Sequence, residues 1–168
     1  SGLVIQYLDH VSGRVARLTR SEGGRWHASD VPMPSNGVVK VVSAGGGTDD
    51  ALLSYESLTT PPSLWYVSPD NRTERVFAVP AAYDASDVVV AQRFATSKDG
   101  TRVPYFVMGR KSVLAGGPAP TVQYGYGGFL AATLPLYYGD PARPQQGALA
   151  GRTWASSRGV LVVSSIPG

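Results

Sequence analysis

With 168 residues, 43% of them hydrophobic and 16% charged, the chain is long enough for one ordinary domain and has a globular rather than a disordered composition. Its net charge of +3 comes from scattered lysines and arginines, which gives little support to nucleic-acid binding. It has no apolar run of about 18 residues that could span a membrane, and the absence of cysteine excludes disulfides and thiol chemistry.

Residues 1–34 are predicted to be β-structure. Residues 3–8 form an apolar, strand-like run, and residues 14–18 alternate polar and apolar side chains with the period of two that a strand requires. A turn is predicted between these two strands at residues 12–13, and another at residues 22–24, because both segments contain glycine.

A more regular pattern follows. Four strand-like segments start 11–13 residues apart and are separated by glycines, prolines or Asp70-Asn71. They cover residues 38–43, 51–57, 63–68 and 74–79. Four short antiparallel strands at even spacing are typical of one propeller blade, although a sandwich sheet has the same pattern. The glycines at 45–47 predict a flexible hairpin loop rather than a phosphate loop, since no Gly-Lys-Ser/Thr follows them.

The pattern changes near residue 85. Asp99-Gly100 is a type I′ hairpin signal between two predicted strands. The expected elements are strands at 88–97, 101–108 and 121–124 (the last one buried), an irregular segment at 130–145, a helix at 148–157 and a strand buried on both faces at 160–164. Strand–loop–helix–strand is the βαβ pattern of an α/β sheet, so the fold class is predicted to change here from all-β to α/β.

The segment Tyr124-Gly125-Tyr126-Gly127-Gly128-Phe129 carries the densest chemical signal. Glycines let the backbone come close to a ligand, and aromatic rings beside them provide apolar walls, with tyrosine adding a hydroxyl donor. Taken alone, the six residues predict a binding or catalytic loop and a glycine-rich turn with half-buried tyrosines equally well.

Several segments together resemble the prolyl oligopeptidase family of serine peptidases. They lie at residues 55–61, 97–104, 124–129 and 159–163, in the order and spacing of that family. The resemblance covers most of residues 50–168 and is weaker over residues 1–50.

This resemblance implies a β-propeller joined to an α/β-hydrolase domain that cleaves short peptides after proline with a Ser-Asp-His triad. Residues 1–79 would then be the end of the propeller, with about one to two blades. Residues 85–168 would be the first part of the α/β-hydrolase catalytic domain, without its later strands.

By the same resemblance, Tyr126 corresponds to the tyrosine that donates to the oxyanion, and Phe129 corresponds to an aromatic residue of the proline pocket. Gly125, Gly127 and Gly128 would let the loop turn and approach the substrate. Phe129 also favours the proline-directed group over a related group that prefers basic residues and tends to have serine and tyrosine here. Core packing stays an alternative for Phe129, since large rings are commonly buried.

No Gly-x-Ser-x-Gly nucleophile elbow occurs in the sequence. In α/β-hydrolases the triad histidine follows the nucleophile, so His10 and His27, which precede the hydrolase part, are expected to be ordinary surface or edge residues. We therefore expect no nucleophile, acid or base in this chain, and no peptidase activity from it alone. The start at Ser1, and Pro167 where the family has arginine, favour a fragment produced by truncation or a frameshift.

Two separated histidines and no cysteine imply no metal or other cofactor. The expected partner of the full-length enzyme is a short proline-containing peptide, with no nucleic acid, membrane or obligate partner. The compartment stays open, with the cytoplasm favoured and the periplasm possible. Alternative functions are a non-catalytic β-rich module that binds peptide through residues 124–129, and a remnant without function.

Overall fold

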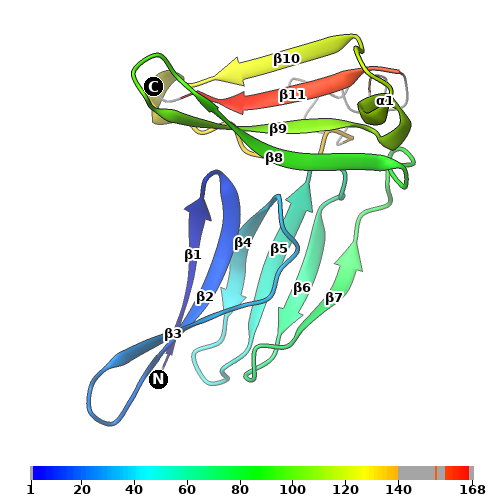
Figure 1. Ribbon diagram of the computed structural model, residues 1–168. Coiled ribbons are helices and arrows are strands. Elements are labelled where there is room, and N and C mark those ends of the chain that lie inside the picture. The colour runs from blue at the N-terminus through cyan, green and yellow to red at the C-terminus, as the bar shows by residue number, and fades with distance from the viewer. Residues whose placement is uncertain (1, 140–153, 155–157, 167–168) are drawn as a thin grey trace.

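The computed structural model describes residues 2–139, 154 and 158–166 (Figure 1). These residues form three β-sheets with very little helix. None of the helices within these ranges is long and apolar enough to cross a membrane. The strands are β1 Gly2–Asp9, β2 Ser12–Arg20, β3 Trp26–Asp30, β4 Gly37–Ala44, β5 Ala51–Ser57, β6 Ser63–Val67, β7 Thr73–Ala78, β8 Val88–Thr96, β9 Arg102–Arg110, β10 Thr121–Tyr126 and β11 Val160–Ser165, and the helices are α1 Lys111–Ala115 and η1 Gly128–Leu130.

The first sheet is the antiparallel series β1-β2-β3, which confirms the two strands predicted at residues 3–8 and 14–18. The turn predicted at residues 12–13 is wrong, because the hairpin turns at His10 and Val11, with φ values of 47° and 63°. Gly13 lies inside β2, where a methyl group added to it would be 2.5 Å from the backbone nitrogen of Val39. Glycine is therefore required at position 13 by close packing against the backbone of β4 and not by a turn.

The second sheet, β4-β5-β6-β7, confirms all four evenly spaced strands in an antiparallel order. Alternate residues of β5 are buried, as expected for a strand with one face on a core. That core is shared with the first sheet, and its buried members are Val15, Val31, Val39, Ala51, Leu53, Tyr55 and Val67. Four consecutive antiparallel strands form the unit of a propeller blade.

A nearly buried arginine joins these two sheets. Arg17 of β2 is 7% exposed, and its Nε donates to Oδ1 of Asn71 at 2.8 Å while a second guanidinium nitrogen donates to the Ser68 carbonyl at 3.2 Å. Asn71 in turn donates to the Ser29 hydroxyl at 2.9 Å. Because a buried charge needs such partners, this network fixes the β6–β7 turn against the first sheet.

The third sheet has the order β10-β11-β9-β8 and lies across the ends of the strands of the other two sheets (Figure 1). It confirms the four strands predicted after residue 85, and β10 pairs with β11 in parallel, as the βαβ pattern requires. The helix predicted at residues 148–157 lies outside the described residues apart from Trp154, so the described part of this sheet is all-β except for α1 and η1.

Two details of the third sheet differ from the prediction. The hairpin at Asp99-Gly100 is not type I′, because only Gly100 has a positive φ, of 87°. Its amide donates to the Ser97 carbonyl at 2.9 Å, as in a type I turn followed by a left-handed glycine. The strand β10 is exposed along its whole length rather than buried, because it is an edge strand, whereas β11 lies between β10 and β9 and is buried as predicted.

A second hydrophobic core joins the second sheet to the third. Leu58, which follows β5 and is fully buried, packs with buried residues of the third sheet and its loops, namely Phe106, Met108, Tyr138, Leu161 and Val163. The hydroxyl of Tyr83 donates to the Leu58 carbonyl at 2.8 Å, and the rings of Tyr83 and Tyr137 stack with centroids 5.8 Å apart. Tyr83, in the segment between β7 and β8, thus contacts Leu58 through its hydroxyl and Tyr137 through its ring.

These tyrosines predict a loss of stability at alkaline pH. Burial raises the pKa of Tyr83 above its usual value of 10.0 and raises the pKa of Tyr138 to about 12. A raised pKa stabilises the fold fully below the unfolded pKa of about 10, and this contribution disappears as pH rises through the folded pKa. Urea unfolding followed by circular dichroism should therefore give a constant free energy between about pH 7 and about pH 9 and a falling one above about pH 10.

Tyr83→Phe should reduce that alkaline fall, because the ring stays and the ionisable group is removed. The control is Tyr7→Phe on β1, where 44% of the tyrosine is exposed and the wild-type slope should persist. If the free energy of unfolding fell equally steeply in Tyr83→Phe and in the wild type between about pH 10 and about pH 12, ionisation of Tyr83 would not be what destabilises the fold.

Candidate active-site loop

The candidate site lies where the parallel strands β10 and β11 end. Tyr126 is the last residue of β10 and pairs with Ser165, the last residue of β11. The Tyr126 carbonyl accepts two hydrogen bonds, from the Ile166 amide at 3.3 Å and from the Thr133 hydroxyl at 3.1 Å. The backbone carbonyl of Tyr126 is therefore held in place, while 43% of the residue is exposed.

The Tyr126 hydroxyl is an available donor. In the described part of the chain it has no hydrogen-bond partner. It lies over the loop backbone, since a methyl group added at Gly128 would be 2.9 Å from the hydroxyl oxygen. A phenol beside half-buried glycine backbone can donate to a ligand oxygen that approaches this edge of the sheet.

The three glycines of the loop allow close contacts within the protein. A methyl group added at Gly127 would lie 2.1 Å from the Ile166 carbonyl oxygen, and one at Gly125 would lie 2.8 Å from Ile166 Cδ1. Added methyl groups at Gly127 and Gly125 would therefore meet the residue that follows β11, and one at Gly128 would meet the ring of Tyr126.

Phe129 projects from the turn η1 into solvent. Its backbone is left-handed, with φ 57° and ψ 31°, and 98% of the residue is exposed. Core packing, the alternative considered from the sequence, is therefore wrong. A left-handed backbone costs a non-glycine residue roughly 1–2 kcal/mol. Because the ring of Phe129 is exposed, burial of the side chain does not offset this cost.

The structure brings Tyr126, Phe129 and the loop glycines together and leaves both histidines elsewhere. His10 lies at the β1–β2 turn with its ring edge-on to Phe94 at 5.0 Å, and His27 is exposed on β3. Both are surface residues, as predicted. Among the described residues no three His, Asp or Glu side chains gather in a group that could hold a metal ion.

Sequence reasoning missed Thr133 and Ser165, which hold the loop in place. The backbone amide of Thr133 donates to the Ser165 hydroxyl at 3.2 Å, in addition to the bond from its own hydroxyl to Tyr126. Thr133 falls in the segment predicted to be irregular, and nothing in the sequence around it indicates contact with a strand end 32 residues away. The contact forms because β10 and β11 pair in parallel, which brings the ends of both strands to the same edge of the sheet.

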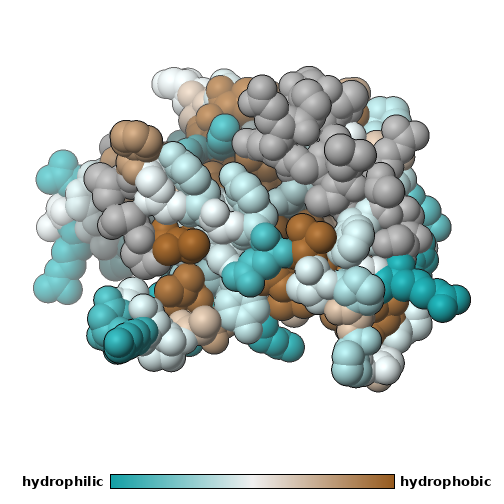
Figure 2. All heavy atoms as spheres, turned by 90° about the horizontal axis from the view of Figure 1, so that it is seen from above, coloured by the Kyte–Doolittle hydropathy of each residue, from teal (hydrophilic) through white to brown (hydrophobic). Residues whose placement is uncertain are grey.

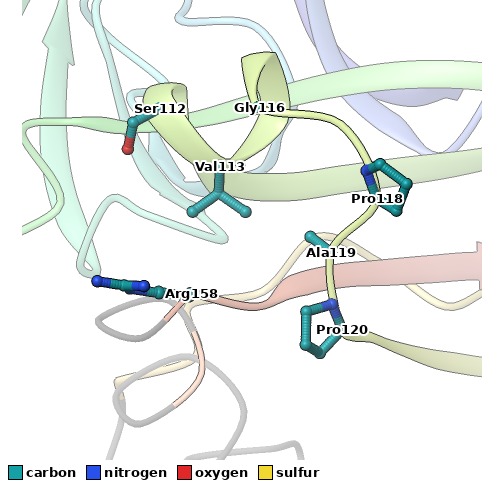
Figure 3. A pocket seen from close by; sticks show the side chains of 7 residues that line it. All are labelled: Ser112, Val113, Gly116, Pro118, Ala119, Pro120 and Arg158. Atoms are coloured by element: carbon teal, nitrogen blue, oxygen red, sulfur yellow. The ribbon is translucent and has the colours of Figure 1, made fainter.

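A separate pocket lies at the opposite ends of β10 and β11, where these strands begin (Figure 3). It has a volume of about 510 Å³ and is lined by Ser112, Val113, Gly116, Pro118, Ala119, Pro120 and Arg158. It contains none of the residues of the candidate site. In the view of Figure 2, apolar residues reach the surface in several separate groups with hydrophilic residues between them.

Comparison with known proteins gives consistent relatives. An uncharacterised peptidase, y4nA, of Sinorhizobium fredii is 30% identical over 167 residues, which are 99% of this chain and 22% of that protein. A prolyl endopeptidase of Elizabethkingia miricola is 24% identical over 140 residues, covering 83% of this chain and 18% of that protein. No family model matches the chain.

A solved structure from a study of two prolyl endopeptidases has a TM-score of 0.74 and 28% identity, and the match covers 98% of this chain and 22% of that one. Fold and relatives together place the chain among the peptidases. It belongs to the prolyl oligopeptidase family, and it spans about a fifth of the length of the relatives it matches.

Proposed function

We propose that this chain contributes the oxyanion-binding loop of a serine endopeptidase that cleaves short peptides after proline. In this proposal, residues 1–79 are the end of a β-propeller and residues 85–168 are the first part of an α/β-hydrolase domain. The mixed sheet supports the second assignment, because Tyr126 ends β10, its third strand in chain order. α/β-Hydrolases take one oxyanion donor from the loop after their third strand.

The observation that carries the proposal is the hydroxyl of Tyr126, which has no hydrogen-bond partner among the described residues and lies above glycine backbone. When a serine attacks a peptide carbonyl, negative charge develops on the carbonyl oxygen. A preorganised donor aimed at that oxygen lowers the barrier by about 3–4 kcal/mol. The exposed ring of Phe129, three residues further on, would form one wall of the pocket for the proline of the substrate.

The 168 residues lack the groups that would carry out the bond cleavage. Its sequence has no Gly-x-Ser-x-Gly elbow, so the nucleophile, the acid and the base would come from other residues of a longer protein. The 168 residues alone should therefore leave a proline-containing reporter peptide uncleaved. No cofactor is part of the proposal.

Binding of a product peptide tests the role of the loop without requiring turnover. N-acetyl-Gly-Pro carries at its proline a carboxylate that can accept a hydrogen bond where the oxyanion would form. In an NMR titration of the 168-residue chain, it should shift the signals of Tyr126 and of residues 127–129. Tyr126→Phe should weaken binding roughly tenfold, since it removes a hydrogen bond to a charged oxygen.

The matched ligand is N-acetyl-Gly-Pro amide, which keeps the proline and lacks the charge. It should bind the wild type more weakly than the acid does, and Tyr126→Phe should remove this difference. Equal affinity of the wild type for acid and amide would contradict the proposed donor. Binding of both ligands with Phe129 shifted and Tyr126 unaffected would favour the second candidate, a non-catalytic peptide-binding module, for which the exposed Phe129 ring is the specific observation.

A further inference from the structure

We propose that Thr133 is a positioning residue for Tyr126, which it holds at the end of β10 so that the phenol is aimed at the ligand. The inference rests on the proposed function, because it concerns the residue taken there as the oxyanion donor. It assigns a role to a threonine in a stretch without regular secondary structure.

Thr133 bridges the ends of two parallel strands. Its hydroxyl donates to the Tyr126 carbonyl, the last of β10, at 3.1 Å, and its amide donates to the hydroxyl of Ser165, the last residue of β11, at 3.2 Å. The Ile166 amide donates to the same Tyr126 carbonyl at 3.3 Å. The carbonyl of Tyr126 is thus held from two sides, one of which is Thr133.

This restraint is needed because the local sequence supplies none. Tyr126 lies between Gly125 and Gly127, and glycine restricts the neighbouring backbone least of all residues. The strand β10 is also an edge strand, so one side of it has no ladder among the described strands. A displacement of about 1 Å at a reacting centre can cost about a hundredfold in rate, so a donor on such a strand requires a fixed backbone.

Thr133 is itself anchored by the residues that follow it. The Tyr137 amide donates to Oε2 of Glu56 at 2.9 Å, and the Tyr137 hydroxyl accepts from the Ala82 amide at 2.9 Å. Tyr137 is buried against the second sheet and the segment that leaves it. The segment from Thr133 to Tyr137 therefore runs between two fixed points, which makes the threonine hydroxyl a firm contact for Tyr126.

The test compares two substitutions of Thr133 in the 168-residue chain, with binding of N-acetyl-Gly-Pro measured by NMR. Thr133→Val keeps the shape and removes the hydroxyl, and it should weaken binding roughly fivefold. Thr133→Ser keeps the hydroxyl and should restore affinity. The matched control is Thr121→Val at the start of β10, where the hydroxyl donates to the Ala119 carbonyl at 3.0 Å, and its affinity should equal that of the wild type.

The readout that separates positioning from general support is the dependence on Tyr126. If Thr133 acts through the phenol, Thr133→Val should have no further effect on binding in a Tyr126→Phe background. An equal loss in both backgrounds would overturn the inference. Wild-type affinity in Thr133→Val while Tyr126→Phe weakens binding would also overturn it, and would leave the proposed function intact. An unchanged affinity in Tyr126→Phe would reject the proposed function itself.

A second variant keeps the test valid if Thr133→Val fails to fold. Ser165→Ala removes the acceptor for the Thr133 amide and leaves both bonds to the Tyr126 carbonyl possible. It should give a smaller loss in the same direction, again only when the Tyr126 hydroxyl is present. A Ser165→Ala chain with full affinity and a wild-type Tyr126 signal would count against the bridge.

Discussion

Replacing Tyr126 by phenylalanine should lower kcat/KM about 10²–10³-fold in a peptidase that uses this loop. The test protein is a chimera in which this chain replaces the matching 22% of the Sinorhizobium fredii relative. Phenylalanine keeps the ring that lies over Gly128 and removes only the hydroxyl. Because the hydrogen bond strengthens as charge develops on the carbonyl oxygen, kcat should fall while KM changes little.

The control for this prediction is Tyr7→Phe on β1, which removes the hydroxyl of a tyrosine of matching exposure, 44% compared with 43% for Tyr126. It should leave both kinetic constants unchanged. A fall of less than about threefold for Tyr126→Phe would mean that other donors hold the oxyanion, whereas a rise in KM with constant kcat would make Tyr126 a ground-state binding residue.

The sequence predicted strands well where evenly spaced breakers or a continuous apolar run marked them. The four strands of the second sheet have breakers at even spacing, and β11 begins with four consecutive apolar residues, so both could be identified without tertiary information. Burial of β10 could not be predicted in the same way. Val122, Tyr124 and Tyr126 alternate with polar residues or glycine along β10, but the place of this strand at the edge of the sheet depends on the order of the strands, which no local pattern encodes.

Turns were predicted less well because tertiary contacts select their conformations. Val11 has a positive φ, which is rare for a β-branched residue, and its side chain packs against the core of the third sheet. Partial burial of this side chain in a contact between two sheets accounts for a turn that the glycine at position 13 had predicted two residues later. At Asp99-Gly100 the residue pair predicted a hairpin, and the number of loop residues decided the turn type.

The candidate site was predictable only where its residues are consecutive. Tyr126, Phe129 and the loop glycines form one motif, so the sequence found them together. Thr133, Ser165 and Ile166 reach the same place through the pairing of β10 with β11 and through an irregular segment. These three residues hold the loop in place. The sequence predicted only the motif at residues 124–129 and not the residues that support it.

Gly127 provides the strongest structural test of this arrangement. Its φ of −150° lies outside the left-handed region, so a positive φ is not what requires glycine here. The requirement is steric, because a methyl group would lie 2.1 Å from the carbonyl oxygen of Ile166, which is a backbone atom next to the end of β11. Gly127→Ala should therefore separate the loop from Ile166, and destabilise the 168-residue chain by about 1–3 kcal/mol in urea unfolding.

In the chimera, Gly127→Ala should lower kcat/KM about a hundredfold, since a displacement of Tyr126 by about 1 Å moves the donor away from the oxyanion. Gly46→Ala is the control for the added methyl group, because nothing lies within 4 Å of that position. It should preserve both stability and activity. Full activity of Gly127→Ala together with an unshifted Ile166 amide signal would contradict this prediction. The loop would then tolerate a side chain at position 127, and the close packing of Gly127 on Ile166 would not be what positions Tyr126.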